Sequence, residues 1–332
     1  MRVTAKQIAN KLGISAAAVS MALNNKDGVS EGLRRTVIDT AREMGYDFSR
    51  IESKHNPSTL VALVFYHKNF IFDPPFFSEL VKNLESELKE CGYELITHQI
   101  HDNDDLETEI RVITQLGSVG ILLLGTTMTL HELEPFLSLK TPMVLLDTFF
   151  GSADRMSVTI NNTAIASEAV DYLIEQRHCQ PGYLQSCQEI VNFKERSQGF
   201  FQSIRAHGYS PSKSIVQSLS PTIEGAYTDM LALLDQQVPL ASCYFADNDA
   251  IAIGAMKAFK ERGYKIPDDI AIVGVDNLPI SSFIEPSLTT YQIPKNYMAR
   301  ISVQVLLGLI QSHQKDTMRI MINGSLIQRH SV

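Results

Sequence analysis

The side chains that most often carry catalysis or bind metals form no recognisable motif in this chain. Its four cysteines are Cys91, Cys179, Cys187 and Cys243. They are scattered, with no C-x-x-C pair and no histidine at zinc-ligand spacing. No glycine-rich nucleotide loop follows an expected strand, and neither a nucleophile elbow nor an H-E-x-x-H is present. We therefore expect no enzyme, no cofactor and no metal, and interpret the cysteines as small buried side chains in a reducing compartment.

Charged side chains are distributed unevenly along the chain. Residues 1–60 contain nine Lys/Arg and six Asp/Glu, whereas the rest contains twenty and thirty-one. A basic head on an acidic body is typical of a nucleic-acid-contacting module joined to a domain without such contacts, although so small an excess also arises by chance. The N-terminus lacks the apolar stretch of a signal peptide, and no apolar run approaches the roughly 20 residues that span a bilayer. We expect a cytoplasmic protein with no membrane contact.

The beginning of the chain has the periodicity of three short amphipathic helices. Thr4 begins a pattern typical of a capping box, and Gly13 ends the first helix. Ser15 is the expected N-cap of the second helix, and Ser30 precedes the third. Two short helices joined by a four-residue turn with a glycine have helix-turn-helix geometry. A three-helix module without a DNA role would show the same periodicity.

From Leu60 onward, short apolar runs alternate with amphipathic stretches. LVALVFY, YELITHQ, VGILLLG and PMVLLDT are typical of buried parallel strands, and the expected helices between the first three end at glycines. A second series of the same kind follows. This alternation predicts two doubly wound α/β lobes, and 332 residues suffice for them beside a small head.

Specific motifs carry a family resemblance along nearly the whole chain. The head contains V-T-x-x-x-I-A, then G-I-S, then S-x-x-x-V-S-x-A-L-N and a closing G-Y, and so resembles the DNA-binding domain of the LacI/GalR repressor family. Segments 74–80, 195–200, 247–255 and 266–277 resemble the periplasmic-binding-protein-like sensor of the same family. The resemblance implies a two-fold dimer with a ligand cleft at the carboxyl ends of the strands.

The fold class implied is an all-α helix-turn-helix head joined to an α/β, two-lobed sensor with two doubly wound parallel sheets. The chain is expected to cross between the lobes near residues 161, 290 and 322. The expected divisions are a head over 1–46, a hinge over 47–59 and a sensor over 60–332, with an N-lobe of about 60–161 and 291–322 and a C-lobe of about 162–290 and 323–332.

The resemblance also implies which head residues contact DNA. The base-reading positions fall on Ala16 and Ala17, and the position after Ser20, often Arg in this family, is Met21. Because Ala and Met offer base edges only apolar contact, we expect weak direct readout and specificity that depends on backbone contacts and DNA shape. The residues expected to contact the DNA backbone are Thr4, Ser15, Ser20, Asn24, Arg34 and Arg35.

The hinge departs from the family pattern. Members usually carry a leucine here that wedges into the minor groove and kinks the duplex. Between Tyr46 and Leu60 this chain has no leucine, the segment is about three residues short, and the wedge position carries His55 or another polar residue. Phe48 and Ile51 are the apolar substitutes. Either this hinge orders less firmly than usual, or another residue bends the DNA.

The resemblance places the ligand site on residues suited to a sugar. A guanidinium and a carboxylate make charge-assisted hydrogen bonds to hydroxyl groups, and an aromatic ring covers an apolar sugar face. Pro74 and Asn161 replace the family's usual Asn and Asp, so a less polar or smaller effector, or none, stays open. Asp249 and Asp276 also fit helix caps or loop anchors. The expected ligand-binding residues are Phe76, Asp147, Asn161, Arg196, Asn248 and Asp276.

Together these features predict a sequence-specific DNA-binding transcriptional regulator, a repressor whose affinity for a palindromic double-stranded operator responds to a small, sugar-type effector. A homodimer without cofactors or metals is expected. Two alternatives stay open at this point. One is a constitutive DNA-binding regulator without an effector, and the other is a sugar-binding protein without a regulatory role.

Overall fold

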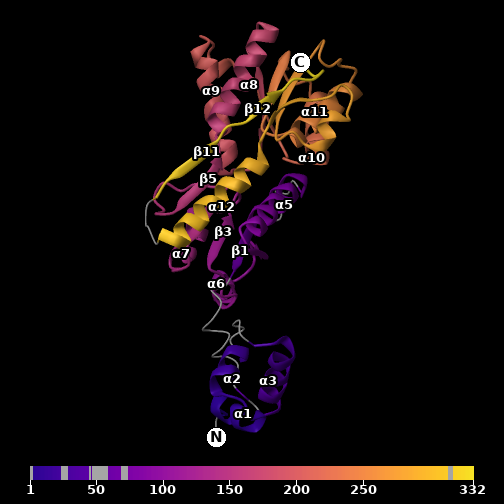
Figure 1. Cartoon of the computed structure of the whole chain (residues 1–332). Helices are drawn as coiled ribbons and strands as arrows, with labels where there is room; N and C mark the ends of the chain where they lie inside the picture. Colours follow the sequence, from indigo (N-terminus) through magenta and orange to yellow (C-terminus); the bar gives the residue numbers. More distant parts are fainter. Residues whose placement is uncertain (1–2, 24–28, 45, 47–58, 69–73, 313–316) are drawn as a thin grey trace. The chain divides into compact units, whose positions relative to one another are not determined.

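The structure is a computed structural model, and its chain divides into two units, Met1–Thr59 and Leu60–Val332 (Figure 1). Each unit is described by itself. The described residues are 3–23, 29–44, 46, 59–68, 74–312 and 317–332.

The first unit is a three-helix head. Its helices are α1 (Ala5–Leu12), α2 (Ala16–Leu23) and α3 (Glu31–Glu43). The Gln7 side-chain oxygen accepts from the backbone N–H of Thr4 over 2.8 Å, and Ser15 Oγ accepts from the backbone N–H of Ala18 over 3.0 Å. Gly13 has a φ of 65°, which lets the chain turn from α1 toward α2 without strain. A small apolar core holds the helices together: Ile8, Ala9, Val19, Ala22, Leu23, Val37 and Ala41.

The sensor begins with its N-lobe, whose six-stranded sheet has the order β11-β5-β4-β3-β1-β2 and is parallel throughout. Every residue of β1 except its first is buried, which is why this strand reads as a continuous apolar run. The strands are β1 (Leu60–His67), β2 (Glu94–His101), β3 (Gly120–Leu124), β4 (Met143–Leu146), β5 (Met156–Ile160) and β11 (Arg319–Ile322). The helices are α5 (Pro74–Glu90), α6 (Leu106–Gln115), α7 (Leu130–Leu137) and α12 (Lys295–Ser312).

The C-lobe repeats this architecture with the sheet order β12-β10-β9-β8-β6-β7. All pairs are parallel except β12 with β10. The strands are β6 (Gly182–Ser186), β7 (Val216–Leu219), β8 (Cys243–Ala246), β9 (Ala271–Val275), β10 (Thr289–Gln292) and β12 (Ser325–Ile327). The helices are α8 (Asn162–Arg177), α9 (Val191–Ala206), α10 (Ile223–Asp235), α11 (Asp249–Glu261) and the short η1 (Pro211–Lys213) and η2 (Pro279–Ser282).

The chain passes between the two lobes at three places. It leaves β5 at Asn161, passes from β10 to α12 through Ile293 and Pro294, and passes from β11 to β12 through Asn323 and Gly324. The second passage comes later than the expected position near 290, because β10 extends to Gln292 by pairing with β12. The predicted fold class, a helical head with a two-lobed α/β sensor, is confirmed.

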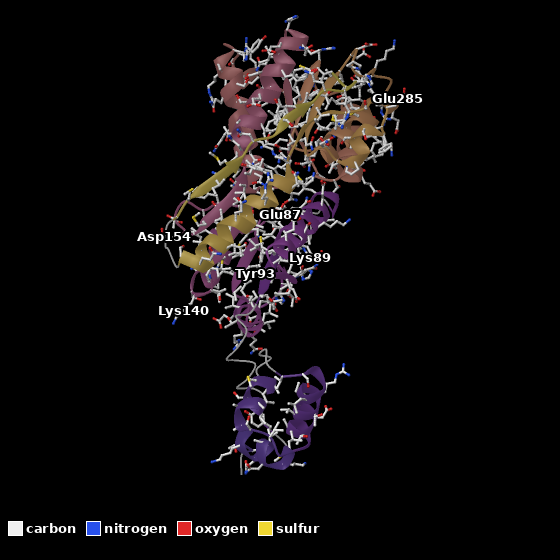
Figure 2. All side chains as sticks on the ribbon, in the orientation of Figure 1. Glu87, Lys89, Tyr93, Lys140, Asp154 and Glu285 are labelled. Atoms are coloured by element: carbon white, nitrogen blue, oxygen red, sulfur yellow. The ribbon has the colours of Figure 1, made fainter. Side chains whose placement is uncertain are left out.

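Charged side chains such as Lys89, Lys140 and Glu285 project from the surface of the sensor (Figure 2). Of the four cysteines, Cys243 alone is buried as expected: Cys91 and Cys187 are exposed, and Cys179 is partly exposed. Among the described residues, no helix is long and apolar enough to cross a membrane.

Candidate functional site

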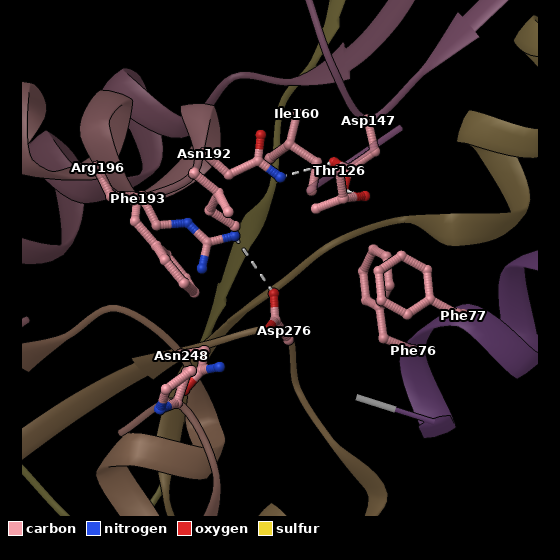
Figure 3. A pocket seen from close by; sticks show the side chains of 12 residues that line it. Phe76, Phe77, Thr126, Asp147, Ile160, Asn192, Phe193, Arg196, Asn248 and Asp276 are labelled. Carbon is pink, nitrogen blue, oxygen red and sulfur yellow. Dashed lines mark hydrogen bonds and ion pairs between the residues drawn. The ribbon is translucent and has the colours of Figure 1, made fainter. Parts of the chain in front are cut away.

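A cavity lies between the lobes at the carboxyl ends of their central strands (Figure 3). Its volume is about 50 Å³, well below the roughly 300–1,000 Å³ of ligand pockets, so a sugar-sized molecule needs a larger cavity than this structure shows. The lining residues are Phe76, Phe77, Thr126, Asp147, Ile160, Ile190, Asn192, Phe193, Arg196, Pro221, Asn248 and Asp276.

The N-lobe wall combines two aromatic rings with one acid. Phe76 and Phe77, from the first turn of α5, meet edge to face with ring centroids 5.2 Å apart. Asp147 directly follows β4 and is 2% exposed, and its Oδ2 accepts from Thr126 Oγ1 over 2.6 Å. Asp147 has a φ of 55°, a backbone conformation that Asp tolerates better than most residues. This wall therefore offers an apolar surface beside one buried carboxylate.

The C-lobe wall is organised around Arg196 on α9, which is 3% exposed. Its Nε donates to Asn162 Oδ1 over 2.9 Å, and its Nη1 donates to the backbone carbonyl of Asp247. Its Nη2 lies 3.5 Å from Asp276 Oδ1, at the end of β9 (Figure 3). Three partners fix the guanidinium plane, and the long contact with Asp276 leaves that carboxylate able to accept a further hydrogen bond.

Close packing of α8 against α9 brings Arg196 to Asn162. A Cβ placed on Gly199 would collide with the backbone carbonyl of Thr163, so only glycine lets the two helices approach this closely. The first residue of α8, Asn162, can therefore reach across to the second turn of α9.

Two polar contacts join the lobes near the cavity. Asn192 Nδ2, on α9, donates to Asp147 Oδ1 over 3.0 Å. Arg319 Nη2, on β11, donates to Glu195 Oε1 over 2.6 Å, while Asn162 Nδ2 donates to Glu195 Oε2 over 3.1 Å. Because Asn162 also accepts from Arg196 Nε, the second contact links a residue that holds Arg196 to the N-lobe sheet.

Buried carboxyl groups dominate the electrostatics of this region. Burial raises the pKa of both Asp147 and Asp247 to about 6 and that of Asp249 to about 7. Burial also raises the pKa of Asp276, and the nearby charge of Arg196 offsets only part of that effect. The cavity wall therefore carries more acidic groups than basic ones.

Some of these polar residues anchor the backbone. Asp249 accepts from the backbone N–H of Leu278 and from the hydroxyls of Ser281 and Thr290, so it holds the loop after β9. Asn248 caps α11 through its Oδ1, which accepts from the Ile251 N–H over 2.9 Å, and its side chain also lines the cavity.

Five of the six predicted ligand residues line the cavity, and Asn161 is the exception. Its Oδ1 caps α8 by accepting from the Ala164 N–H, and its Nδ2 donates to Asn323 Oδ1 over 2.8 Å. Asn161 thus joins two of the segments that connect the lobes. The five that the structure brings together are Phe76, Asp147, Arg196, Asn248 and Asp276.

Most of the expected DNA-contacting residues that the structure describes are exposed on the head. Ala16 and Ala17 are exposed in the first turn of α2, Met21 is half-buried, and Val19 faces the core. The remaining expected contacts that are exposed are Thr4, Ser15, Ser20 and Arg35.

Several predicted positions lie outside the described residues. The side chain of Arg34 is not described, although its backbone belongs to α3. The others are Asn24 and the hinge residues Phe48, Ile51 and His55.

Comparison with known proteins decides the family. The HTH-type transcriptional repressor CytR of Escherichia coli (strain K12) is 32% identical over 333 residues, which cover 99% of this chain and 96% of the relative. The chain belongs to the LacI/GalR family. The HTH-type transcriptional regulator GalS of Salmonella typhimurium is 27% identical over 334 residues. These relatives are transcriptional regulators, which confirms the prediction of a LacI/GalR-family regulator rather than an enzyme.

Domain and structure matches agree with this family. Residues 170–332 match the periplasmic binding protein-like domain. The transcriptional regulator CelR in complex with cellobiose is 25% identical, covers 100% of both chains and has a TM-score of 0.73. A lac repressor dimer bound to operator is 20% identical over 100% of this chain and 99% of that chain, with a TM-score of 0.78, and shows the shared fold.

Seven of the twelve residues that line the cavity of this LacI/GalR-family regulator were not predicted from the sequence. Asn192 and Phe193 precede Arg196 by four and three residues, so helical periodicity places all three on one face of α9. This helical spacing is the sequence signal from which Asn192 and Phe193 could have been predicted as lining residues. Phe77 is next to the predicted Phe76, but Thr126 follows a strand whose end carried no such pattern.

Proposed function

We propose that this regulator binds a palindromic DNA operator as a homodimer, represses transcription in the cytoplasm and responds to a small, uncharged carbohydrate in the inter-lobe cleft. The exposed first turn of α2, capped by Ser15, supports DNA binding by the head. The observation that carries the ligand proposal is the Arg196–Asp276 pair, which faces the Phe76 side of one cavity (Figure 3).

The chemistry of the cavity favours a neutral, hydroxyl-rich ligand. Asp276 can accept from a hydroxyl, Asn248 Nδ2 can donate to one, and the phenylalanine rings can cover an apolar face. A phosphate or carboxylate would meet Asp147 and Asp276, both of which resist adding further negative charge nearby. Among the structural neighbours, CelR was solved with cellobiose and a regulator from Enterococcus faecium with ribose.

The proposed response is a linkage between cleft and operator. A ligand that prefers one arrangement of the lobes shifts the population of that arrangement in both subunits, and with it the spacing of the two heads. The change in operator affinity is limited to the ligand's differential affinity for the two arrangements.

Thermal-shift screening tests the ligand class directly. The full chain is heated with a panel of neutral mono- and disaccharides and with the matching sugar phosphates. We expect at least one neutral sugar to raise Tm and its phosphorylated counterpart to leave Tm unchanged. A rise with the phosphorylated sugar only would overturn the proposed ligand class.

Selection from a random DNA library tests the regulator function. We expect enrichment of a palindrome with half-sites one helical turn apart, bound with an affinity that falls steeply as salt rises. Sequence-indifferent binding would contradict operator recognition and favour a sugar-binding protein without a regulatory role.

A constitutive regulator is the second candidate, because Arg196 already has three protein partners and the cavity is small. The two candidates differ in one result. If no sugar in the panel raises Tm while the palindrome is still selected, the constitutive regulator is favoured.

A further inference from the structure

Two cysteine sulfur atoms lie in contact on the C-lobe. Cys179 Sγ is 3.6 Å from Cys243 Sγ and 3.2 Å from Ser242 Oγ. Cys179 follows the end of α8 by two residues, and Cys243 is the first residue of β8, so the contact joins segments 64 positions apart in the sequence. A disulfide has an S–S distance of about 2.05 Å, so an approach of roughly 1.5 Å would bond them.

The two thiols differ in access to solvent. Cys179 is partly exposed, whereas Cys243 is 0% exposed, and burial raises the pKa of the Cys243 thiol. A dissolved oxidant therefore reaches Cys179 first, while Cys243 stays protonated and protected until Cys179 has reacted. Redox-sensor cysteines are accessible to solvent and often lie next to a second, resolving cysteine, and this pair has both features.

We propose that Cys179 and Cys243 form a reversible disulfide when the protein meets a peroxide. Cys179 thiolate attacks a peroxide oxygen, the O–O bond breaks and hydroxide leaves, which gives a sulfenic acid at Cys179. Cys243 sulfur then attacks Cys179 sulfur, the S–O bond breaks, and the proton of Cys243 leaves with the hydroxyl as water. With hydrogen peroxide, two thiols and one peroxide give one disulfide and two waters, and a dithiol reverses the reaction by exchange.

The two cysteines lie at the far ends of the two elements, α8 and β8, that lead to hydrogen-bond partners of Arg196. α8 begins at Asn162, which accepts from Arg196 Nε, and β8 runs into Asp247, whose carbonyl accepts from Arg196 Nη1. The disulfide would tie together the opposite ends of these two elements. It would therefore restrict the motion of α8 against β8, and only the effect of this restriction on ligand binding rests on the proposed function.

Peptide mapping of the full-length protein tests the proposal. The reduced chain is treated with a small excess of hydrogen peroxide, the remaining thiols are alkylated, and the digest is analysed by mass spectrometry without reduction. We expect a Cys179–Cys243 cross-linked peptide that disappears with dithiothreitol, while Cys91 and Cys187 form no cross-link. The Cys91→Ser and Cys187→Ser variants, which change the exposed cysteines, serve as matched controls and should form the same cross-link.

A variant without the second cysteine tests for the sulfenic acid intermediate at Cys179. In Cys243→Ser the sulfenic acid at Cys179 has no resolving thiol, so we expect dimedone to trap it there at a level several-fold above that in the unaltered protein. The proposal is overturned if peroxide carries Cys179 to sulfinic acid while Cys243 remains alkylatable, or if Cys91 or Cys187 forms the first disulfide. Since these readouts need neither operator nor sugar, they are independent of the outcome of the function tests.

Discussion

Asn192 donates a hydrogen bond to Asp147 over 3.0 Å and thereby joins the two lobes across the cleft. Both residues are buried, at 5% and 2% exposed, and both line the cavity that a ligand would enter. A ligand that offers its own hydroxyl to Asp147 competes with Asn192 for the same acceptor. If the proposed ligand takes Asp147 as an acceptor in place of Asn192, its binding is coupled through this carboxylate to the contact between the lobes.

Replacing Asn192 tests this coupling. Asn192→Ala leaves one Asp147 oxygen without its donor, which should lower the free energy of unfolding by about 1–3 kcal/mol. Asn192→Asp sets a second carboxylate against Asp147 and should separate the lobes further. Small-angle X-ray scattering of the sensor in the full chain would report this as a larger radius of gyration for Asp than for Ala. Equal radii for all three proteins would show that the bond does not close the lobes.

A double-mutant cycle can measure the second contact between lobes. Arg319 and Glu195 are mostly buried, with side chains 21% and 15% exposed, so the cycle of Arg319→Gln with Glu195→Gln should give a coupling energy of about 1–3 kcal/mol. The Arg262–Asp235 pair is the control, because its side chains are 34% and 60% exposed and solvent should make its coupling clearly smaller. Similar coupling energies in the two cycles would contradict a larger contribution of the Arg319–Glu195 pair to stability.

The raised pKa of Asp147 predicts a pH dependence with a definite sign. A carboxyl that ionises near pH 4 when unfolded and at about 6 when folded binds more protons in the folded state between these values, so stability falls as pH rises through that window. Asp147→Asn keeps the shape of the side chain but cannot ionise, so this contribution to the fall in stability with rising pH disappears. Urea unfolding should show the variant about 3 kcal/mol more stable than the unaltered protein at pH 7 and nearly equal to it near pH 4.

Exposed Asp154 provides the control for this experiment (Figure 2). Asp154→Asn should change stability by less than about 0.5 kcal/mol at either pH. If Asp147→Asn were less stable than the unaltered protein at pH 7, the hydrogen bonds to Thr126 and Asn192 would outweigh the burial of the charge, and the predicted sign would be wrong.

Asp276 should matter for ligand affinity rather than for DNA binding. Among the described residues, its carboxylate has one hydrogen-bond partner, Arg196 at 3.5 Å, so it can accept a further hydrogen bond from a hydroxyl. A hydrogen bond to a charged group contributes about 1.5–3 kcal/mol, so Asp276→Asn should weaken the sugar found by thermal shift roughly 10- to 150-fold. Titration calorimetry gives this ratio, and a gel-shift titration without sugar should be unchanged. An unaltered sugar affinity would remove Asp276 from the site.

The sequence predicts some parts of this molecule better than others, for physical reasons. Buried parallel strands such as β1 are apolar throughout, and helix caps such as Ser15 use short-range chemistry, so both are visible in the sequence. The Asn192–Asp147 bond and the Cys179–Cys243 contact join residues 45 and 64 positions apart, and only tertiary packing brings them together. Asn161 differs in another way: its family position predicts a ligand contact, and in this structure its side chain caps α8 outside the cavity lining.

Salt dependence separates phosphate contacts from other effects in the head. Arg35 is exposed on α3, and a phosphate contact contributes about 0.9 to the slope of log K against log salt. Arg35→Gln should therefore reduce the slope by about 0.9 per head, or roughly 1.8 for a dimer, and weaken all DNA sequences alike. Lys89→Gln, on the exposed surface of the sensor, should leave the slope unchanged (Figure 2). A loss of affinity at Arg35 confined to one operator sequence, with the slope intact, would instead assign Arg35 to base readout.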